Sequence, residues 1–425
     1  MGKKRIVITG TGAVCAAGRS PEAILETVRS GRSAIGPIGQ WDASTWPTRV
    51  AGEVPDFNAR ELVEDRKLHK LIRRTDFFGL YAASKAVEAS GLAACRDALD
   101  AAAAAEYSDR TGVYVGSGGG SYESQYDYFP LLTESHDALP AFGRELSATV
   151  NPMWLLRTLP NNVLGHIGIR HGFKGANACI TNHSIGGTLA VIEATEGLRN
   201  GEADRALAVG HDAPIEPQMV LYYHGVGLLA KETIRPFDAR RDGSLFGEGA
   251  AALALETEDS ARARGAAVLG EVLGGGAGTD AQGLLAIRDD GDALARAIEL
   301  ALDDAGVRPG EVGMIAAHGN GTLQSDASEA AAIRRVFGGG APPATAFKWA
   351  FGHLIAAAGI LEAVLALHAL RERSIPGVAS YAVADPVCEG VRVAAEAQVP
   401  TSDIALILCR GFAGTNAALL LGAAR

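Results

Sequence analysis

The stretch that decides how this chain folds is Gly175-Ala-Asn-Ala-Cys-Ile-Thr-Asn-His-Ser184-Ile-Gly-Gly-Thr-Leu-Ala190. A short run ends at Ser184, and a segment with apolar periodicity follows it as far as Leu198, which predicts a strand, a tight turn and a helix. A side chain at such a turn stands clear of the backbone, and the free N–H groups and dipole of the helix favour a nucleophile and an oxyanion. Ser184 is therefore the candidate nucleophile, and the structural alternative is a serine that only caps the helix.

Composition and charge narrow the class of protein. The 425 residues are 48% hydrophobic, which is enough for a sizeable core in two or three average domains or in one large duplicated domain. The net charge of -10 argues against nucleic acid as a partner. The chain starts directly with a predicted strand, and no apolar run reaches spanning length, so we expect a cytoplasmic protein with no membrane partner.

The cysteines show no C-x-x-C spacing, so we expect neither a disulfide framework nor a zinc site. They are predicted to be buried, reduced thiols at positions 15, 95, 179, 388 and 409. A dinucleotide site is also rejected, because Cys15 stands where the G-x-G-x-x-G pattern that starts at Gly10 needs its third glycine.

Strands and helices alternate through the whole chain, which predicts an α/β fold. In the first half we expect a glycine turn at 10–12 and surface loops at 31–62 and 121–149, with strands at 5–9, 111–116 and 205–210 and helices at 21–30 and 74–90. The aromatic residues of 121–149 either line an opening or belong to a plain surface excursion. The second half repeats the layout with strands at 267–273 and 314–317 and a helix at 292–305. The repetition predicts an internal duplication, with halves 1–259 and 260–425.

Three segments of the second half place polar groups at the ends of apolar strands, where open α/β sheets carry their chemistry. They are Ala316-Ala-His318-Gly-Asn-Gly-Thr322, Lys348-Trp-Ala-Phe-Gly-His353 and Cys409-Arg-Gly-Phe412-Ala-Gly-Thr-Asn416. A lone histidine is more often structural than catalytic. Two histidines, each beside a glycine at a strand-to-helix junction, favour catalysis.

With these segments the chain resembles the β-ketoacyl-acyl carrier protein synthases, most closely the type II elongating ketosynthases of the thiolase fold. The resemblance covers nearly the whole chain and implies a five-layered αβαβα architecture of two similar halves, paired as a homodimer. It also implies that no metal or cofactor is bound and that an acyl or peptidyl carrier protein brings the substrate on its phosphopantetheine. It is carried by Arg5-Ile-Val-Ile-Thr-Gly-Thr-Gly-Ala-Val14, Leu159-Pro-Asn-Asn-Val-Leu-Gly-His-Ile-Gly-Ile-Arg170, Arg235-Pro-Phe-Asp238, Gly352-His-Leu-Ile-Ala-Ala-Ala-Gly359 and Gly411-Phe-Ala-Gly-Thr-Asn416.

The resemblance also assigns roles to individual residues. The nucleophilic cysteine of the family falls on Ser184, in the first half. In the second half, His318 and His353 match its two active-site histidines and Lys348 matches its lysine. Phe412 matches the phenylalanine that gates the acyl pocket, and the backbone N–H groups of Ser184 and Phe412 are expected to form an oxyanion hole. Cys179 lies five residues before the nucleophile, inside the predicted strand, and is interpreted as buried packing.

Several positions depart from the family pattern and argue against an intact extender site. Asn320 replaces a threonine two residues before Thr322, and Arg410 replaces a phenylalanine of the closing phrase. Tyr223 and His224 bring polar groups to a wall of the acyl pocket that is apolar in the family. All five residues are predicted to contact the substrate.

The change from cysteine to serine decides the chemistry. A thiol with a reference pKa of about 8.5 is partly ionised by a helix N-terminus alone, whereas a serine hydroxyl needs a base, so a histidine must take its proton. We therefore predict an enzyme of specialised metabolism that loads an acyl or aminoacyl chain onto Ser184. It would release the chain by acyl transfer or by intramolecular cyclisation, through aldol addition and β-lactone closure.

In this chemistry the chain resembles the stand-alone ketosynthase-like cyclases of γ-lactam-β-lactone pathways such as that of salinosporamide. Two alternatives remain open. One is a conventional decarboxylating synthase. The other is a non-catalytic subunit similar to a chain-length factor, against which the retention of His318, His353 and Lys348 argues.

Overall fold

The structure is a computed structural model that describes residues 3–119, 128–136 and 138–424. Within these residues, eleven strands form one large sheet in the order β11-β10-β9-β12-β13-β8-β1-β7-β6-β4-β5. The strands are β1 (Ile6–Cys15), β4 (Thr111–Ser117), β5 (Asn177–Ile180), β6 (Arg205–Asp212), β7 (Gly249–Thr257), β8 (Gly270–Thr279), β9 (Met314–Ala316), β10 (Pro343–Thr345), β11 (Arg392–Val393), β12 (Ile404–Gly411) and β13 (Thr415–Ala423).

The sheet contains the same pattern twice. The first half runs β5-β4-β6-β7-β1 and the second, apart from the short edge strand β11, runs β10-β9-β12-β13-β8. With β11 left out of the count, each half has its third, second, fourth, fifth and first strand in that order. In each half the first three strands of this order are parallel and the last two pair antiparallel. The pairing of β1 with β8 joins the halves. The topology therefore confirms the predicted architecture of two similar halves.

Helices cover both faces of each half. The helices are α1 (Pro21–Arg29), α2 (Ala59–Leu62), α3 (Arg74–Ser90), α4 (Leu92–Asp97), α5 (Ala101–Asp109), α6 (Phe129–Glu134), α7 (Leu139–Thr149), α8 (Trp154–Thr158), α9 (Asn162–His171), α10 (Gly186–Arg199), α11 (Pro217–Gly225), α12 (Glu258–Ala263), α13 (Asp292–Ala305), α14 (Leu323–Phe337), α15 (Lys348–Phe351) and α16 (Ala358–Arg371).

Five layers follow from how these helices pack. α3 lies on the outer face of the first half, and α13, with α14 against it, covers the outer face of the second. α10 and α16 pack against each other and against strands of both halves, so they form the middle layer. α16 is buried from Ala358 to Leu370, as expected for a helix that is apolar on nearly all sides.

The predicted glycine turn at 10–12 is wrong, because β1 continues through Gly10 and Gly12 to Cys15 and pairs with β7 along its length. The glycines serve close packing instead. A Cβ on Gly12 would lie 2.1 Å from the carbonyl oxygen of Ala82 in α3, so only glycine lets the helix backbone approach the strand.

The other predicted elements agree with the structure except in the region 121–149. The helices expected at 74–90 and 292–305 have those bounds, and 31–62 is mostly loop with the short strands β2 (Gly36–Pro37) and β3 (Val50–Ala51) besides α2. The loop expected at 121–149 contains α6 and α7, each with a proline in its first turn, a position that favours helix initiation. The remainder of that prediction, residues 121–127 and 137, lies outside the described residues.

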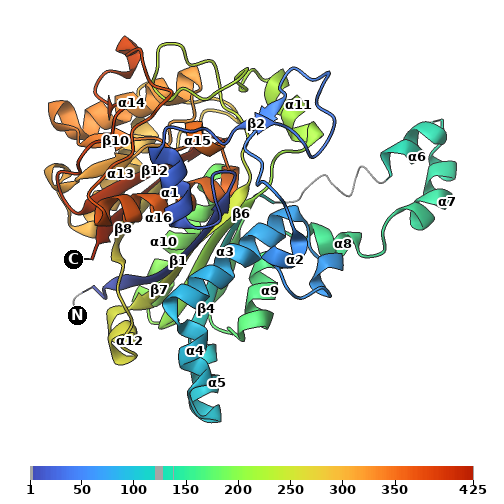
Figure 1. Ribbon diagram of the computed structural model, residues 1–425, viewed down its shortest axis with the longest axis horizontal. Coiled ribbons are helices and arrows are strands. Elements are labelled where there is room, and N and C mark those ends of the chain that lie inside the picture. Colours follow the sequence, from blue (N-terminus) through green and yellow to red (C-terminus); the bar gives the residue numbers. More distant parts are fainter. Residues whose placement is uncertain (1–2, 120–127, 137, 425) are drawn as a thin grey trace.

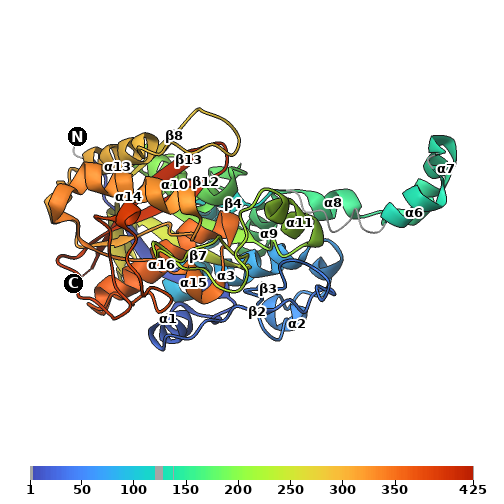
Figure 2. The ribbon, with the colours of Figure 1, turned by 90° about the horizontal axis from the view of Figure 1, so that it is seen from above.

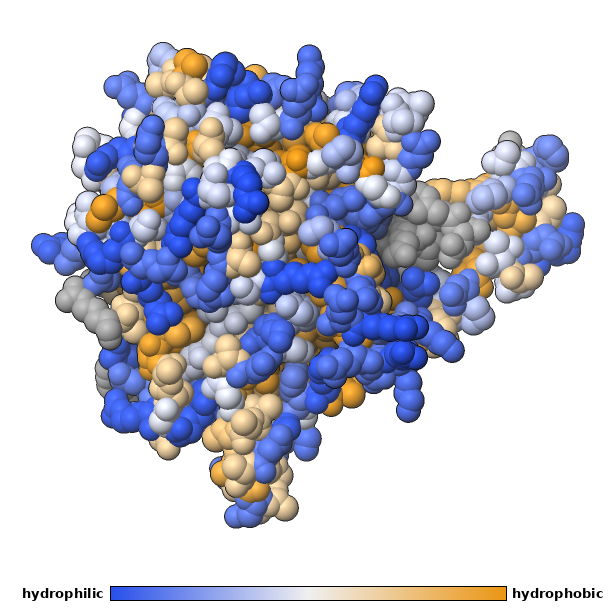
Figure 3. Space-filling view, viewed as in Figure 1, coloured by the Kyte–Doolittle hydropathy of each residue, from blue (hydrophilic) through white to orange (hydrophobic). Residues whose placement is uncertain are grey.

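α6 and α7 project from the body of the molecule (Figures 1 and 2). The face shown in Figure 3 is mostly hydrophilic, with apolar residues scattered over it. Exposed apolar side chains also occur on the projecting helices, at Phe129, Leu132 and Leu139. Of the helices in the described part of the chain, none is both long enough and apolar enough to span a membrane.

Candidate active site

Ser184 lies where the sequence places it, between a strand and a helix. β5 ends at Ile180, a single 3-10 turn covers His183–Ile185, and α10 begins at Gly186. The capping position of α10 is Ile185, and in the described residues the Ser184 hydroxyl bonds to two imidazoles instead. The alternative of a serine that only caps the helix is therefore not what the structure shows. The side chain is buried, with 1% of the residue exposed.

The two imidazoles belong to His183 and His353. Ser184 Oγ lies 2.9 Å from Nδ1 of His183 and 3.3 Å from Nε2 of His353. Nδ1 of His353 accepts the N–H of Ile355 at 3.2 Å, so the ring carries its proton on Nε2 and donates it to Ser184 Oγ. The serine hydroxyl is left to donate its own hydrogen to His183.

The proton on His183 is placed by the same reasoning. The backbone N–H of Phe412 points at Nδ1 of His183 at 3.3 Å and can only donate, so Nδ1 is an acceptor. The other nitrogen, Nε2, therefore carries the proton and donates it to the Tyr223 hydroxyl at 2.6 Å. Burial lowers the pKa of His183 to about 4, so the ring is neutral at pH 7.

His183 is the site residue that the sequence did not predict. Its φ of +44° is left-handed, a conformation that costs a non-glycine residue about 1 kcal/mol or more and that tends to mark functional sites. Its ring stacks on Phe412 with centroids 4.4 Å apart, and Phe412 also stacks on Tyr223, with centroids 5.1 Å apart. The only signal in the sequence was a histidine next to Ser184. This signal could not be interpreted without the backbone conformation that turns the ring back onto Ser184.

His318 lies beside His353, with ring centroids 5.1 Å apart, and both line the cavity above Ser184. Its Nδ1 accepts the backbone N–H of Arg410 at 3.3 Å, so Nε2 carries the proton here as well. Burial, and after it the charge of Lys348, lower the pKa of both histidines well below the usual range. Both are therefore neutral N–H donors at pH 7.

Lys348 is placed behind the histidines. It is fully buried, donates to the carbonyl oxygen of His318 at 2.6 Å, and forms an ion pair with the buried Glu362 at 2.6 Å. It is not among the residues that line the cavity. Its contacts give it a positioning role for the loop of His318, and its predicted catalytic role stays a prediction.

The cavity has a volume of about 250 Å³, and most of the residues predicted to contact substrate line it. Asn320, Thr322 and Tyr223 line it together with Ser184. His224 does not line it and is exposed, so its assignment as a substrate contact stays a prediction. Successive side chains of α11 point about 100° apart, which turns His224 to the surface when Tyr223 faces the cavity.

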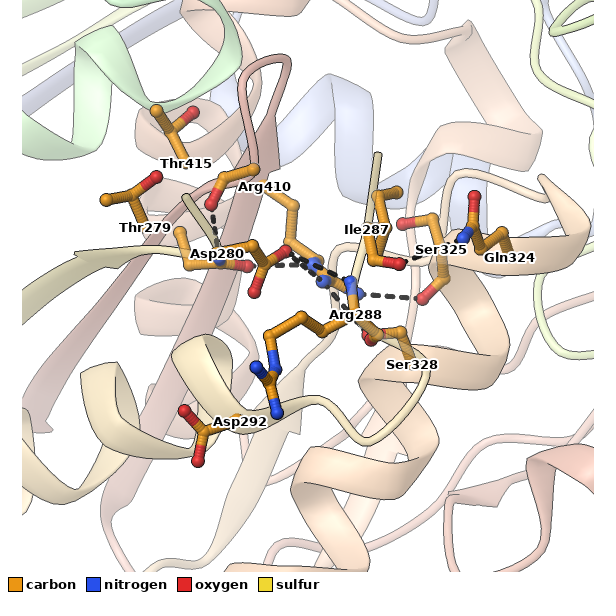
Figure 4. Close-up of polar contacts among 12 residues, drawn as sticks. Thr279, Asp280, Ile287, Arg288, Asp292, Gln324, Ser325, Ser328, Arg410 and Thr415 are labelled. Atoms are coloured by element: carbon orange, nitrogen blue, oxygen red, sulfur yellow. Dashed lines mark hydrogen bonds and ion pairs between the residues drawn. The ribbon is translucent and has the colours of Figure 1, made fainter. Parts of the chain in front are cut away.

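Arg410 lines the cavity, but its guanidinium group is held by the protein (Figure 4). It donates to Asn416 Oδ1 at 2.8 Å, to the Ser325 carbonyl oxygen at 2.9 Å and to Ser328 Oγ at 3.1 Å, and Asp280 lies 3.8 Å away. Only 4% of the residue is exposed. The geometry therefore indicates that Arg410 fixes the loops around the cavity, and its expected contact with substrate stays a prediction.

The cysteines differ partly from expectation. Cys179 lies in β5 as predicted, but it is only half-buried, because β5 is the edge strand of the sheet. Cys95, in α4, is half-buried too. Burial nevertheless raises the pKa of the Cys179 thiol. No disulfide forms, since all five cysteines are free. Within the described ranges, no cluster of three or more His, Cys, Asp or Glu side chains is arranged to hold a metal ion.

A second cavity, of about 590 Å³, lies on the other side of His183 and is partly polar. Arg73 lines it with 3% of the residue exposed, and in the described residues its guanidinium makes no hydrogen bond, only a 3.9 Å ion pair with Asp76. Asp212 lines the same cavity, and burial raises its pKa to about 7.

The doubled sheet, the buried Ser184 at a helix start and the paired histidines agree with a thiolase-like ketosynthase fold. Family models agree, because the N-terminal domain of β-ketoacyl synthases matches residues 3–261 and their C-terminal domain matches residues 269–382. The chain belongs to the β-ketoacyl synthase family, which confirms the predicted family and fold.

Three proteins illustrate the likeness. The chain is 31% identical to a 3-oxoacyl-[acyl-carrier-protein] synthase 2 of Staphylococcus aureus (strain N315), over 98% of each chain. Among solved structures it is similar to the ishigamide ketosynthase/chain length factor, with a TM-score of 0.87 and 31% identity over 100% of both chains. The fold is also that of a type II PKS ketosynthase solved in complex with its acyl-carrier protein and bound to the hexaketide, with a TM-score of 0.84 and 24% identity over 100% of both chains.

Proposed function

We propose that this chain is a ketosynthase-like enzyme that takes an acyl or aminoacyl chain from a carrier protein onto Ser184 and releases it by intramolecular cyclisation. The observation that carries the proposal is the pair of imidazoles on Ser184 Oγ, one accepting its hydrogen and one donating to its oxygen. A serine so placed is equipped for nucleophilic attack. The carrier is inferred from the names of the relatives and from the neighbour solved with its acyl-carrier protein.

Release without an extender unit is supported by the loop of Asn320. Thr322 donates both its backbone N–H and its hydroxyl to Asn320 Oδ1, at 3.0 and 2.9 Å. The threonine hydroxyl is therefore occupied within the loop and is not free to donate to an incoming extender.

The release step is proposed as follows. The α-proton of the Ser184 ester moves to Nδ1 of His183, the accepting imidazole nitrogen at the serine, and the N–H groups of His318 and His353 stabilise the enolate oxygen. The enolate carbon attacks a carbonyl within the chain and forms a C–C bond and an alkoxide. The alkoxide attacks the ester carbon, the bond to Ser184 Oγ breaks, and the serine recovers the proton from Nδ1 of His183 as the β-lactone leaves. The polar second cavity, with Arg73 and Asp212, accommodates a chain that carries such a carbonyl.

The test is a single-turnover reaction with a carrier-bound chain that has an internal carbonyl. The expected product is one water lighter than the free acid, because the chain closes on itself. Release of the free acid would instead show hydrolysis and contradict cyclisation.

Conventional elongation is the second candidate, favoured by the likeness to 3-oxoacyl-[acyl-carrier-protein] synthases. It predicts that the enzyme releases carbon dioxide from malonyl-carrier protein in proportion to chain growth. A non-catalytic subunit, the third reading, predicts no acylation of Ser184 and no turnover with either substrate.

A further inference from the structure

Among the described residues, His183 has the one imidazole nitrogen that faces Ser184 Oγ as an acceptor. The backbone N–H of Ile355 occupies Nδ1 of His353, so the nitrogen that His353 turns to the serine carries a proton. Nδ1 of His318 is likewise occupied by the N–H of Arg410. Neither histidine of the family pair is in the state that a base for the serine requires.

We infer that His183 is the general base that takes the proton of Ser184 during acyl loading. Tyr223 acts as a positioning residue, because its oxygen accepts the Nε2 proton and so keeps Nδ1 as the acceptor. The inference rests on the proposed acylation of Ser184 and names the group that makes it possible.

The step balances within the site. Ser184 Oγ attacks the thioester carbonyl as its proton moves to Nδ1 of His183, and the carbonyl oxygen becomes an oxyanion. When the intermediate collapses, the C–S bond breaks and the departing pantetheine thiolate takes the proton from Nδ1. The products are the Ser184 oxyester, a free thiol and a neutral His183.

The same proton transfer frees a donor for the oxyanion. At rest the Phe412 N–H, one of the two donors expected to form the oxyanion hole, is engaged by Nδ1 of His183. Once Nδ1 carries a proton it can no longer accept from this N–H. The Phe412 N–H therefore loses its partner at the moment when the oxyanion forms. Protonation of His183 is in this way coupled to completion of the oxyanion hole.

Loading of Ser184 from a small acyl thioester tests the inference, measured by intact-protein mass spectrometry in the Ser184 protein and in Ser184→Cys. His183→Asn removes the base, and asparagine tolerates the left-handed backbone better than most residues. In the Ser184 protein the loading rate is expected to fall about 10²- to 10⁴-fold, as for loss of a general base. In the Ser184→Cys background we expect less than about a tenfold loss, because a thiol ionises without that base.

An equal loss in both backgrounds would show that His183 is only structural, and less than a tenfold loss in the Ser184 protein would exclude it as the base.

Tyr223→Phe keeps the ring but removes the acceptor of the Nε2 proton. It should slow loading of Ser184 but not of Cys at that position, and no effect on Ser184 would overturn the role of Tyr223. The matched control is Tyr222→Phe, the same change on the exposed neighbour. If the unmodified enzyme never loads Ser184, the proposed function fails, which is a different result from a failure of His183.

Discussion

At the scale of single residues, the replacement of a thiol by a hydroxyl changes what the surroundings must supply. A cysteine at a helix start needs no neighbouring base, whereas Ser184 has a histidine at 2.9 Å from its oxygen, and the Phe412 N–H and Tyr223 fix the tautomer of that histidine. Under the proposed function the family histidines have another task. Both rings line the cavity and carry their proton on Nε2, so each can donate to a developing enolate but cannot take the serine proton there.

This division of labour predicts that His318→Ala and His353→Ala fail after loading. Each variant should still acquire the acyl group on Ser184, because His183 is intact, and should release product about 10² to 10³ times more slowly, as when one oxyanion donor is lost. Single-turnover mass spectrometry of the acyl-enzyme and of the product measures both stages. Release at the unmodified rate by both variants would contradict a role for these histidines in the enolate step.

The buried pair of Lys348 and Glu362 predicts a large effect on stability. Lys348→Met leaves the Glu362 carboxyl buried without its cation, which typically costs about 3 to 5 kcal/mol in the free energy of unfolding. Urea denaturation measures it. The matched control is the double variant Lys348→Met/Glu362→Gln, which removes both charges and should recover part of the loss. A single variant as stable as the unmodified protein would argue against the ion pair.

At the scale of elements, hydrophobic periodicity was a good guide wherever a helix has one buried face. α3 and α13 have the predicted bounds, since their apolar residues recur every three or four positions. The predicted β1 was too short because glycine normally signals a turn. Here Gly12 serves close packing against α3, a helix about 70 residues away in the chain, which no local pattern reveals. His183 was missed for a similar reason, since its role depends on a left-handed backbone angle that no local pattern encodes.

The close contact of β1 with α3 predicts that Gly12→Ala destabilises the fold. The added Cβ would lie 2.1 Å from the Ala82 carbonyl oxygen, so strand or helix must move, and overpacking of this kind costs about 1 to 3 kcal/mol. Urea denaturation is the measurement. Gly165→Ala in α9 is the control, because nothing lies within 4 Å of its Cβ and the change should stabilise the helix by about 0.5 to 1 kcal/mol. Equal stability of the two variants would contradict this account of β1.

At the scale of the whole molecule, the duplicated fold explains where the site lies. Ser184 lies in the turn just before α10 in the first half of the sequence, whereas His318 and His353 follow β9 and α15 in the second. The site forms where the halves meet, near the packed helices α10 and α16 of the middle layer. The sequence predicted these three residues from the family resemblance, but not the division of roles among the histidines, because that depends on which backbone N–H each ring accepts.

The homodimer implied by the family resemblance stays a prediction at this scale. We expect light scattering to give twice the chain mass of 43.9 kDa. The projecting helices α6 and α7, with exposed Phe129, Leu132 and Leu139, are the proposed contact, so Leu139→Glu should shift the protein toward monomer. Leu300→Glu, at an exposed position on α13, is the control and should not. A monomeric unmodified protein would contradict the prediction.

The central claim, that Ser184 carries the acyl chain, is tested most directly by mapping the acyl group after reaction with a carrier-bound substrate. Digestion after Lys174 and Arg199 gives one peptide that contains both Ser184 and Cys179, so fragmentation and treatment with neutral hydroxylamine must distinguish them. Hydroxylamine cleaves thioesters readily and oxyesters slowly. We predict an adduct on Ser184 that survives this treatment and is missing from Ser184→Ala. An adduct on Cys179 that hydroxylamine removes and that persists in Ser184→Ala would contradict the account.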